Sequence, residues 1–133
     1  MLFRSKVKEG LLLNKHVFWT PWVTESELAD KMRDADMFIF PSYAEGGARV
    51  VTEAMAMGLP VITTWNSGTP ITHGYDGIIS ELDALMIFNF VVELFNDPQR
   101  MWEIGRNAHQ TIRQSISDEE YISKFDIDFS LFK

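Results

Sequence analysis

The chain has 133 residues, of which 46% are hydrophobic and 23% charged, which is enough to bury one core but not two separate ones. Its formal net charge of −7 offers no basic surface for nucleic acid or anionic lipid, so we expect neither as a partner. The absence of cysteine excludes disulfides, thiolate chemistry and cysteine-bound zinc, and no apolar run reaches the roughly 20 residues that span a membrane. We therefore expect a single cytoplasmic domain over residues 1–133 with no transmembrane segment.

The first third of the chain is predicted to contain two helices and one strand. Apolar residues among lysines and Arg4 predict the end of an amphipathic helix over residues 1–14. The aromatic run at 16–19 stops at Thr20-Pro21 and predicts a buried strand. A serine or threonine cap with acidic residues in the first turn, followed by an apolar stripe, then predicts a helix over about 26–35.

The middle of the chain alternates strands with a helix. Residues 37–40 are continuously apolar and end at a proline, which predicts a strand covered on both faces in a parallel sheet. Residues 48–57 predict a helix that ends at Gly58. Residues 61–64 predict the next strand, and 77–80 a short strand after a turn.

The last third is predicted to be helical. Residues 82–95 form a strongly apolar helix, Asp97-Pro98 opens another to about residue 113, and 117–120 begin a last short one. Strands that alternate with helices imply right-handed crossovers and a three-layer, mostly parallel sheet, so the fold class is α/β. The three histidines lack ligand spacing, and we expect no metal site.

Chemistry is concentrated in and just before the helix predicted at 48–57. This helix is apolar on most sides, so Glu53 is expected to be partly desolvated and to need a donor from a protein group or a ligand hydroxyl. Glu45 lies at the carboxyl end of the preceding strand, where ligands of open α/β sheets bind. Gly46 and Gly47 allow close approach to the main chain, and the helix's first amides suit phosphate or sugar oxygens.

A purely structural role accounts for the same residue types. Glu45 would then cap the helix electrostatically, the glycines would form a turn, and Glu53 would pair with a nearby Arg or Lys. The residue types alone leave the structural and the ligand-binding interpretations open.

The order and spacing of these residues resemble those of a known family. Glu45 and Glu53 are separated by seven residues within Pro-Ser-x-x-Glu-Gly and Glu-Ala-Met-Ala-x-Gly-x-Pro-Val. This pattern resembles the E-x7-E signature of family 4 retaining glycosyltransferases of the GT-B fold, and the similarity covers roughly residues 14 to 115. The resemblance implies a Rossmann-like carboxyl-terminal domain. It also implies hexosyl transfer with retention from a nucleoside-diphosphate sugar of UDP or GDP type, without metal or another cofactor.

The resemblance also implies roles for individual residues. In that family the first glutamate contacts hydroxyls of the donor sugar and the second accepts from the ribose hydroxyls. Glu45 is therefore expected to be the catalytic residue and Glu53 to bind the ribose. The remaining donor-binding and nucleotide-binding positions are expected to be Gly46, Gly47, Ala48 and Val50.

Some family features have no counterpart in this sequence. The family's domain begins with two more strands and a helix that carry cations for the diphosphate, and an acceptor domain precedes it. The loop 66–77 is shorter than usual and lacks a glutamate. We therefore expect a truncated donor-binding domain that is inactive alone, the alternative being a non-catalytic nucleotide-binding or association module. Because open apolar sheet edges favour association, a homodimer or strand exchange through the open edge near Phe18, Trp19 and Trp22 is a further hypothesis.

Overall fold

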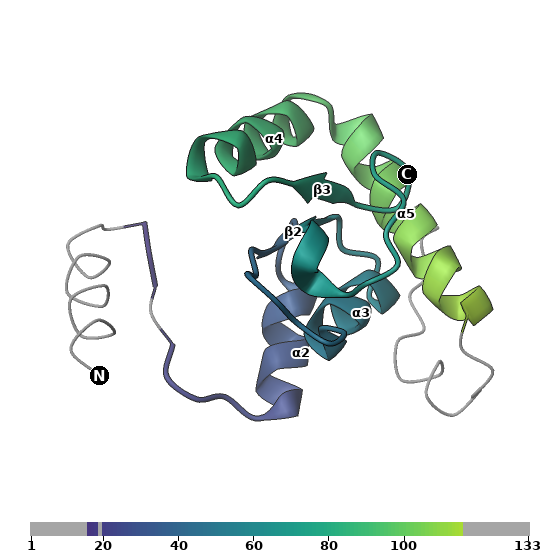
Figure 1. Ribbon diagram of the computed structural model, residues 1–133. Helices are drawn as coiled ribbons and strands as arrows, with labels where there is room; N and C mark the ends of the chain where they lie inside the picture. The colour runs from purple at the N-terminus through teal and green to yellow at the C-terminus, as the bar shows by residue number, and fades with distance from the viewer. Residues whose placement is uncertain (1–15, 19, 116–133) are drawn as a thin grey trace. The chain divides into compact units, whose positions relative to one another are not determined.

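The computed structural model describes residues 16–18 and 20–115, and the chain divides into two compact units, Met1–Lys31 and Met32–Lys133. The elements, shown in Figure 1, are α2 (Glu25–Arg33), β1 (Phe38–Phe40), α3 (Arg49–Ala56), β2 (Val61–Thr64), the 3-10 helix η1 (Trp65–Ser67), β3 (Ile78–Ser80), α4 (Ala84–Asn96) and α5 (Pro98–Ser115). The helices predicted over 1–14 and from 117 lie outside the described residues.

Helix α2 begins with a cap, as its sequence predicts, and the structure shows that Thr24 forms it reciprocally with Glu27. The Thr24 hydroxyl accepts from the amide of Glu27 at 3.3 Å, and the Glu27 carboxylate accepts from the amide of Thr24 at 2.7 Å. Two amides that the helix cannot satisfy internally are thereby paired. The hydrogen bond from the Thr24 backbone lowers the pKa of Glu27 from its usual value. The predicted helix over 26–35 is confirmed, with bounds at 25 and 33.

The strand predicted over 16–19 is wrong for the residues that are described. Residues 16–18 form no strand, and the side chain of Phe18 is 88% exposed instead of buried. Trp19 lies outside the described residues. Aromatic content favours a strand only where a partner strand and a core face exist, and no described strand pairs with this segment. Trp22 lies in a loop, as expected.

The described strands form one parallel sheet in the order β1-β2-β3. Phe38 pairs with Val61, and Ile62 with Ile78. All four residues of the central strand β2 are buried, which confirms the parallel-sheet prediction. Among the described strands β1 lies at an edge, and Ile39 is 41% exposed. The expected cover on both faces of this strand is therefore wrong, because an edge strand lies at the margin of the helical layers.

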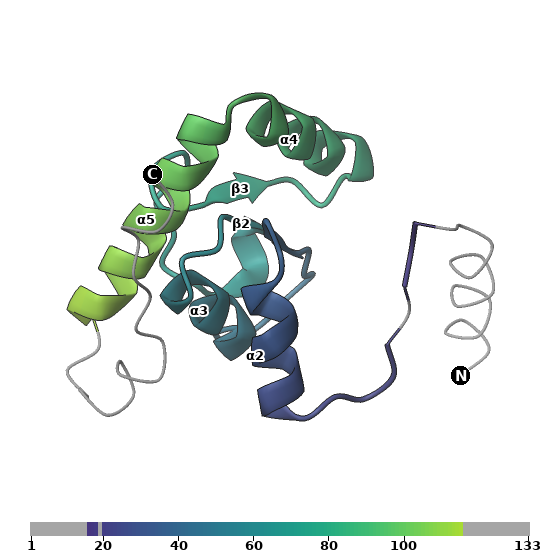
Figure 2. The same cartoon turned by 180° about the vertical axis from the view of Figure 1, so that it is seen from behind.

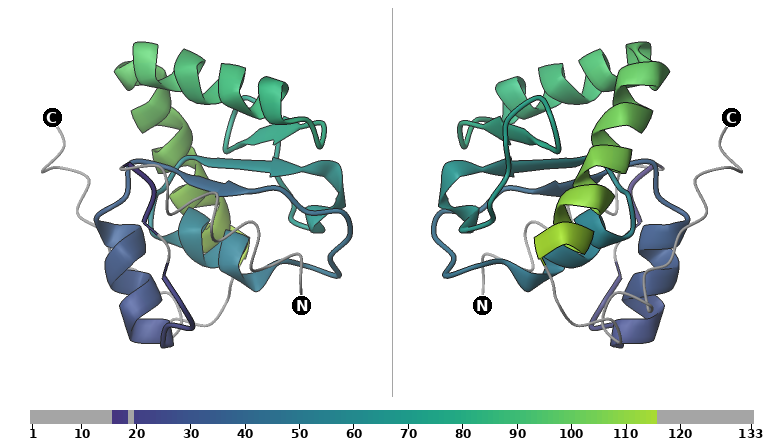
Figure 3. Two further views of the ribbon diagram at one scale, coloured as in Figure 1. Left: turned by 90° about the vertical axis from the view of Figure 1, so that its left-hand side faces the viewer. Right: turned by 90° about the vertical axis from the view of Figure 1, so that its right-hand side faces the viewer.

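Helices cover both faces of the sheet. Helix α4 lies on one face and α3 on the other, as Figures 1 and 3 show, and the reverse view in Figure 2 shows α5 beside both of them. The core between the sheet, α4 and α5 is formed by Ile62, Ile78, Leu94 and Ile104. The three-layer α/β prediction is confirmed. Among the described helices, none combines the length and apolar character that crossing a bilayer would need.

Helices α3 and α5 approach each other closely through small residues. Gly105 of α5 lies against the carbonyl oxygen of Gly58, which a Cβ atom at position 105 would meet. One turn further along α5, the buried ring of His109 places Nδ1 2.6 Å from the carbonyl oxygen of Ala56. Because a carbonyl oxygen can only accept, Nδ1 carries the proton of this hydrogen bond. His109 therefore has a structural role in joining the two helices.

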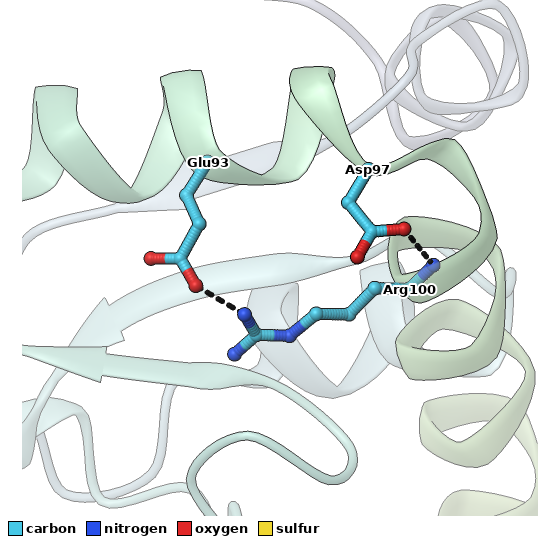
Figure 4. A network of polar contacts seen from close by, with 3 residues as sticks. All are labelled: Glu93, Asp97 and Arg100. Carbon is cyan, nitrogen blue, oxygen red and sulfur yellow. Dashed lines mark hydrogen bonds and ion pairs between the residues drawn. The ribbon is translucent and has the colours of Figure 1, made fainter.

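Helices α4 and α5 meet at a corner with its own polar contacts. The Asp83 carboxylate caps α4 by accepting from the amide of Met86, and Asp97 caps α5 by accepting from the amide of Arg100. The Arg100 side chain reaches back to the carboxylate of Glu93 on α4, as Figure 4 shows. The helices predicted over 82–95 and from 97 to 113 are confirmed, with bounds at 84–96 and 98–115.

Candidate functional site

The carboxyl ends of β1 and β2 lie at the same edge of the sheet because the strands are parallel. Hydroxyl groups at the end of β2 bind the chain that leaves β1. The Thr64 hydroxyl donates to the carbonyl oxygen of Ser42 at 2.6 Å and accepts from the Ser42 amide at 3.1 Å, while the Thr63 hydroxyl donates to the carbonyl of Phe40. The two loops that follow these strands therefore start from fixed positions.

Further along, the two loops contact each other through their backbones. The amide of Glu45 donates to the carbonyl oxygen of Asn66 at 2.7 Å, and the amide of Ala48 donates to the carbonyl oxygen of Ser67 at 3.0 Å. Gly68 has a φ of +66°, and a Cβ atom there would lie 2.7 Å from the Gly47 nitrogen and 2.8 Å from the Glu45 oxygen. Only glycine fits at this position.

Gly68 is a site-forming residue that the sequence analysis did not identify. In the sequence it is one of several turn-forming residues between two strands. Its requirement for glycine comes from a loop about twenty residues earlier, so no local pattern marks it.

The amides predicted to bind a ligand divide into two groups. The amide of Ala48 is occupied by Ser67 and holds the two loops together. Within the part of the chain that the structure describes, the amides of Gly46 and Gly47 donate to no protein oxygen. Gly47 has a φ of 123° and Gly46 borders open space. Ala48 is the N-cap of α3 and brings no side-chain acceptor, so the start of the helix presents donors without a capping group.

Glu45 lies in the loop before α3, and its side chain is exposed. Among the described residues no group donates to its carboxylate, and α3 has no side-chain cap. The carboxylate therefore remains available as an acceptor for a ligand hydroxyl.

Glu53 lies one turn into α3 and is partly buried, as expected, with 20% of its side chain exposed. Its Oε1 accepts from Nε of Arg49 at 2.8 Å, so the predicted pairing with a nearby cation is present. This i,i+4 pair is partly solvated, and pairs of this kind contribute about 0.3–0.5 kcal/mol. The carboxylate retains its second oxygen, Oε2, as an acceptor. Val50, also in the first turn of α3, is half-buried.

Two aromatic side chains flank the same loops and were not identified from the sequence. Tyr43 precedes Glu45 by two residues, Trp65 precedes Asn66, and both side chains are exposed. Exposed aromatic rings present a flat apolar face with a polar edge. Their position directly after two predicted strands, where ligands of open α/β sheets bind, was the sequence signal that could have identified them. Among the described residues there is no group of three His, Asp or Glu side chains that could hold a metal ion.

Comparison with known proteins identifies the family. The sequence profile of the family described as Glycosyl transferases group 1 matches residues 3–97, and the chain belongs to this family. It is 35% identical over 91 residues to the D-inositol 3-phosphate glycosyltransferase of Arthrobacter sp. (strain FB24), a match that covers 66% of this chain and 22% of that protein. It is 26% identical over 105 residues to the N-acetyl-alpha-D-glucosaminyl L-malate synthase of Bacillus anthracis, covering 77% and 28%. The chain thus spans about a quarter of these curated relatives.

Solved structures show the same fold. The carboxyl-terminal domain of the group 1 glycosyl transferase LpcC from Francisella tularensis has a TM-score of 0.78 at 21% identity, covering 86% of this chain and 62% of that one. Sucrose-phosphate synthase from Thermosynechococcus elongatus has a TM-score of 0.76 at 26% identity, covering 92% and 31%. HepE from Anabaena, solved with UDP and glucose, has a TM-score of 0.75 at 23% identity, covering 92% and 33%. The fold is that of GT-B carboxyl-terminal domains, as predicted.

Proposed function

We propose that this chain binds a nucleoside-diphosphate sugar of UDP or GDP type, as the donor-binding part of a retaining glycosyltransferase. One observation carries the proposal. Glu45 and Glu53, two carboxylates with unused acceptor oxygens, flank amides without protein acceptors at the carboxyl edge of the sheet. Membership of the Glycosyl transferases group 1 family supports glycosyl transfer, and the HepE structure with UDP and glucose supports this donor class.

Each residue in the proposed site has a distinct role. Glu45 accepts from hydroxyls of the donor sugar as the catalytic carboxylate, and Oε2 of Glu53 accepts from the ribose while Oε1 stays with Arg49. The amides of Gly46 and Gly47 donate to the sugar and diphosphate oxygens, where they stabilise the charge of the departing diphosphate. The two remaining residues act through position, because Ala48 holds the loop and Val50 lines the nucleotide pocket.

We expect binding with little turnover by this chain alone. A departing diphosphate is stabilised by cations as well as amides. Within residues 41–68 the only Lys or Arg is Arg49, and it is already paired with Glu53. A family-typical reaction therefore requires further basic residues near the diphosphate.

Calorimetric titration with UDP and GDP tests the site. We expect binding in the high-micromolar range, weakened at least about 10-fold in Glu53→Ala because a charge-assisted hydrogen bond is lost. Arg49→Met breaks the same ion pair but keeps the carboxylate, so its loss of affinity should be smaller. Glu103→Ala, on the exposed face of α5, should bind like the unmodified chain.

Two results would contradict the proposal. Absence of binding by the unmodified chain would mean that the motif is retained only as architecture. Equal losses in Glu53→Ala and Arg49→Met would mean that the ion pair, and not the carboxylate, supports the nucleotide.

A further inference from the structure

Helix α4 has a second apolar face that points away from the sheet. Leu94 and its neighbours on the inner face fill the core, as expected for a covering helix. The outer face carries a stripe of four large apolar side chains, with exposed fractions of 67%, 60%, 39% and 52% for Leu85, Phe88, Val92 and Phe95. A surface helix ordinarily presents polar residues on this side. We call these four residues the outer stripe.

The outer stripe is of the size that a weak, reversible interface buries. With fully exposed side chains of this size presenting about 200 Å² each, its four exposed fractions amount to roughly 440 Å² per copy. Two such stripes together present roughly 900 Å², which lies in the range of weak and transient protein interfaces.

Charge favours an uncharged partner surface. The only charged residue in α4 is Glu93, and its carboxylate is engaged by Arg100, as Figure 4 shows. Residues 84–96 contain no Lys or Arg, which a helix lying on a lipid surface needs on its polar face. The net charge of −7 further disfavours anionic membranes. A protein surface of the same apolar character therefore fits better than a bilayer.

The spacing of the outer stripe is complementary to itself. Its four residues are spaced by three, four and three positions, the spacing found along the contact line of two packed helices. This order of spacings is the same whether the helix is followed from its amino or its carboxyl end. An antiparallel pair about a two-fold axis therefore places the smaller side chains opposite the larger ones. Leu85 meets Phe95 of the partner subunit, and Phe88 meets Val92 of the partner subunit.

We propose that two copies of this chain associate through the outer stripe of α4 as an antiparallel helix pair. A closed two-fold contact uses the same patch on both copies, so the outer stripe of each copy is covered by that of the other. The association does not depend on nucleotide binding. It also differs from the dimer hypothesised around Phe18 and Trp22, because it uses a different element.

Light scattering on size-exclusion fractions tests the association. At up to about 100 μM, where an interface of this size is populated, we expect a dimer. Phe88→Glu should raise the dimer dissociation constant at least about 30-fold, as loss of an aromatic anchor does. Trp22→Glu, at a 97% exposed position outside α4, should leave the dimer intact. Circular dichroism verifies folding, and Leu85→Lys provides a second charged variant within the stripe.

Cross-linking tests the antiparallel arrangement. The chain contains no cysteine, so single cysteines report one contact each. A mixture of Phe88→Cys and Val92→Cys chains should form mixed disulfides at least about 10-fold faster than either variant alone, because only the mixture brings two thiols together.

Four results of the light-scattering and cross-linking experiments would overturn the proposal. They are a monomer at all concentrations, a dimer that survives Phe88→Glu, a dimer lost in Trp22→Glu instead, and preferential cross-linking between identical positions. Flotation of the unmodified chain with phosphatidylcholine vesicles, abolished in Phe88→Glu, would likewise assign the stripe to a membrane and overturn the dimer.

Discussion

Three glycines in the loops that connect the strands meet different steric requirements. Gly68 has both a left-handed backbone and no room for a Cβ atom, because the Glu45–Gly47 backbone lies against it. Gly74, in the turn before β3, has a φ of +79° but borders open space. Gly46 has open space and no such backbone constraint. Gly68 therefore combines steric contact with backbone strain, Gly74 has the backbone strain alone, and Gly46 has neither.

Replacement of each glycine by alanine should give graded losses of stability. Gly68→Ala should lower the free energy of unfolding by about 1–3 kcal/mol, because strain and a backbone clash combine. Gly74→Ala should cost about 1 kcal/mol from the left-handed backbone alone. Gly46→Ala should change it by less than about 0.5 kcal/mol. Urea unfolding measures all three, and equal values for Gly46→Ala and Gly68→Ala would show that the loops separate in solution.

The two glutamates show what residue types can and cannot predict. Because Glu53 and Arg49 are four residues apart on one helix, their pairing follows from helical geometry alone. The environment of Glu45 depends on Asn66, which belongs to another loop. The spacing of the motif therefore identified the carboxylates, while the contacts of their loop became known only from the fold.

At the scale of elements, helix boundaries were predictable because their signals are local. The capping residues of α2, α4 and α5 lie within three residues of the amides that they bind. Strand signals are weaker, since residues 16–18 and 38–40 both contain β-branched and aromatic side chains and only the latter form a strand. A strand exists only where a neighbour pairs with it.

The cap of α2 should make its first turn sensitive to acid. The pKa of Glu27 is lowered in the folded helix, so its stabilising effect is complete above the usual value of 4.5 and is lost as the pH falls through the lower folded value. An NMR titration of the Glu27 carboxyl should therefore show a midpoint below 4.5.

A hydroxyl-deleting variant separates the two hydrogen bonds with Thr24, which are the largest causes of this shift. The backbone amide of Thr24 contributes most to the lowering, so Thr24→Ala should retain the larger part of it. A midpoint for Glu27 at or above its usual value in the unmodified chain would show that the cap does not form.

At the scale of the whole molecule, a buried carboxylate connects the turn before β3 to α5. Asp76 accepts from the amide of Thr72 at 2.7 Å and from the hydroxyl of Thr111 at 2.8 Å. Close by, the Asn107 side chain donates to the carbonyl of Tyr75. The long last helix is thereby held against a loop more than thirty residues earlier in the chain.

Loss of the Thr111 donor should be costly for the whole fold. Thr111→Val removes one of the two donors of a buried carboxylate and should lower the free energy of unfolding by about 1.5–3 kcal/mol. Asn107→Ala removes a solvent-exposed hydrogen bond nearby and should cost less than about 1 kcal/mol. Urea denaturation compares the two variants, and similar losses would mean that Asp76 is hydrated and not tied to α5.

The sequence by itself determined the family and the order of helices and strands from residue 25 to residue 115, and it marked Glu45 and Glu53 as the predicted site carboxylates. Each of these follows from residues close together in the chain, namely caps, apolar periodicity and a motif of fixed spacing. Local free-energy preferences act over one or two turns, so a single window of sequence contains them.

Only the tertiary structure decided which groups remain unpaired. It placed β1 at an edge, engaged the Ala48 amide with Ser67, buried Asp76 against Thr111 and left the outer stripe of α4 exposed. The sequence showed α4 to be apolar but not that it has two apolar faces with one covered. Coverage and hydrogen-bond satisfaction depend on residues brought together from distant parts of the chain, and local preferences carry no information about those partners.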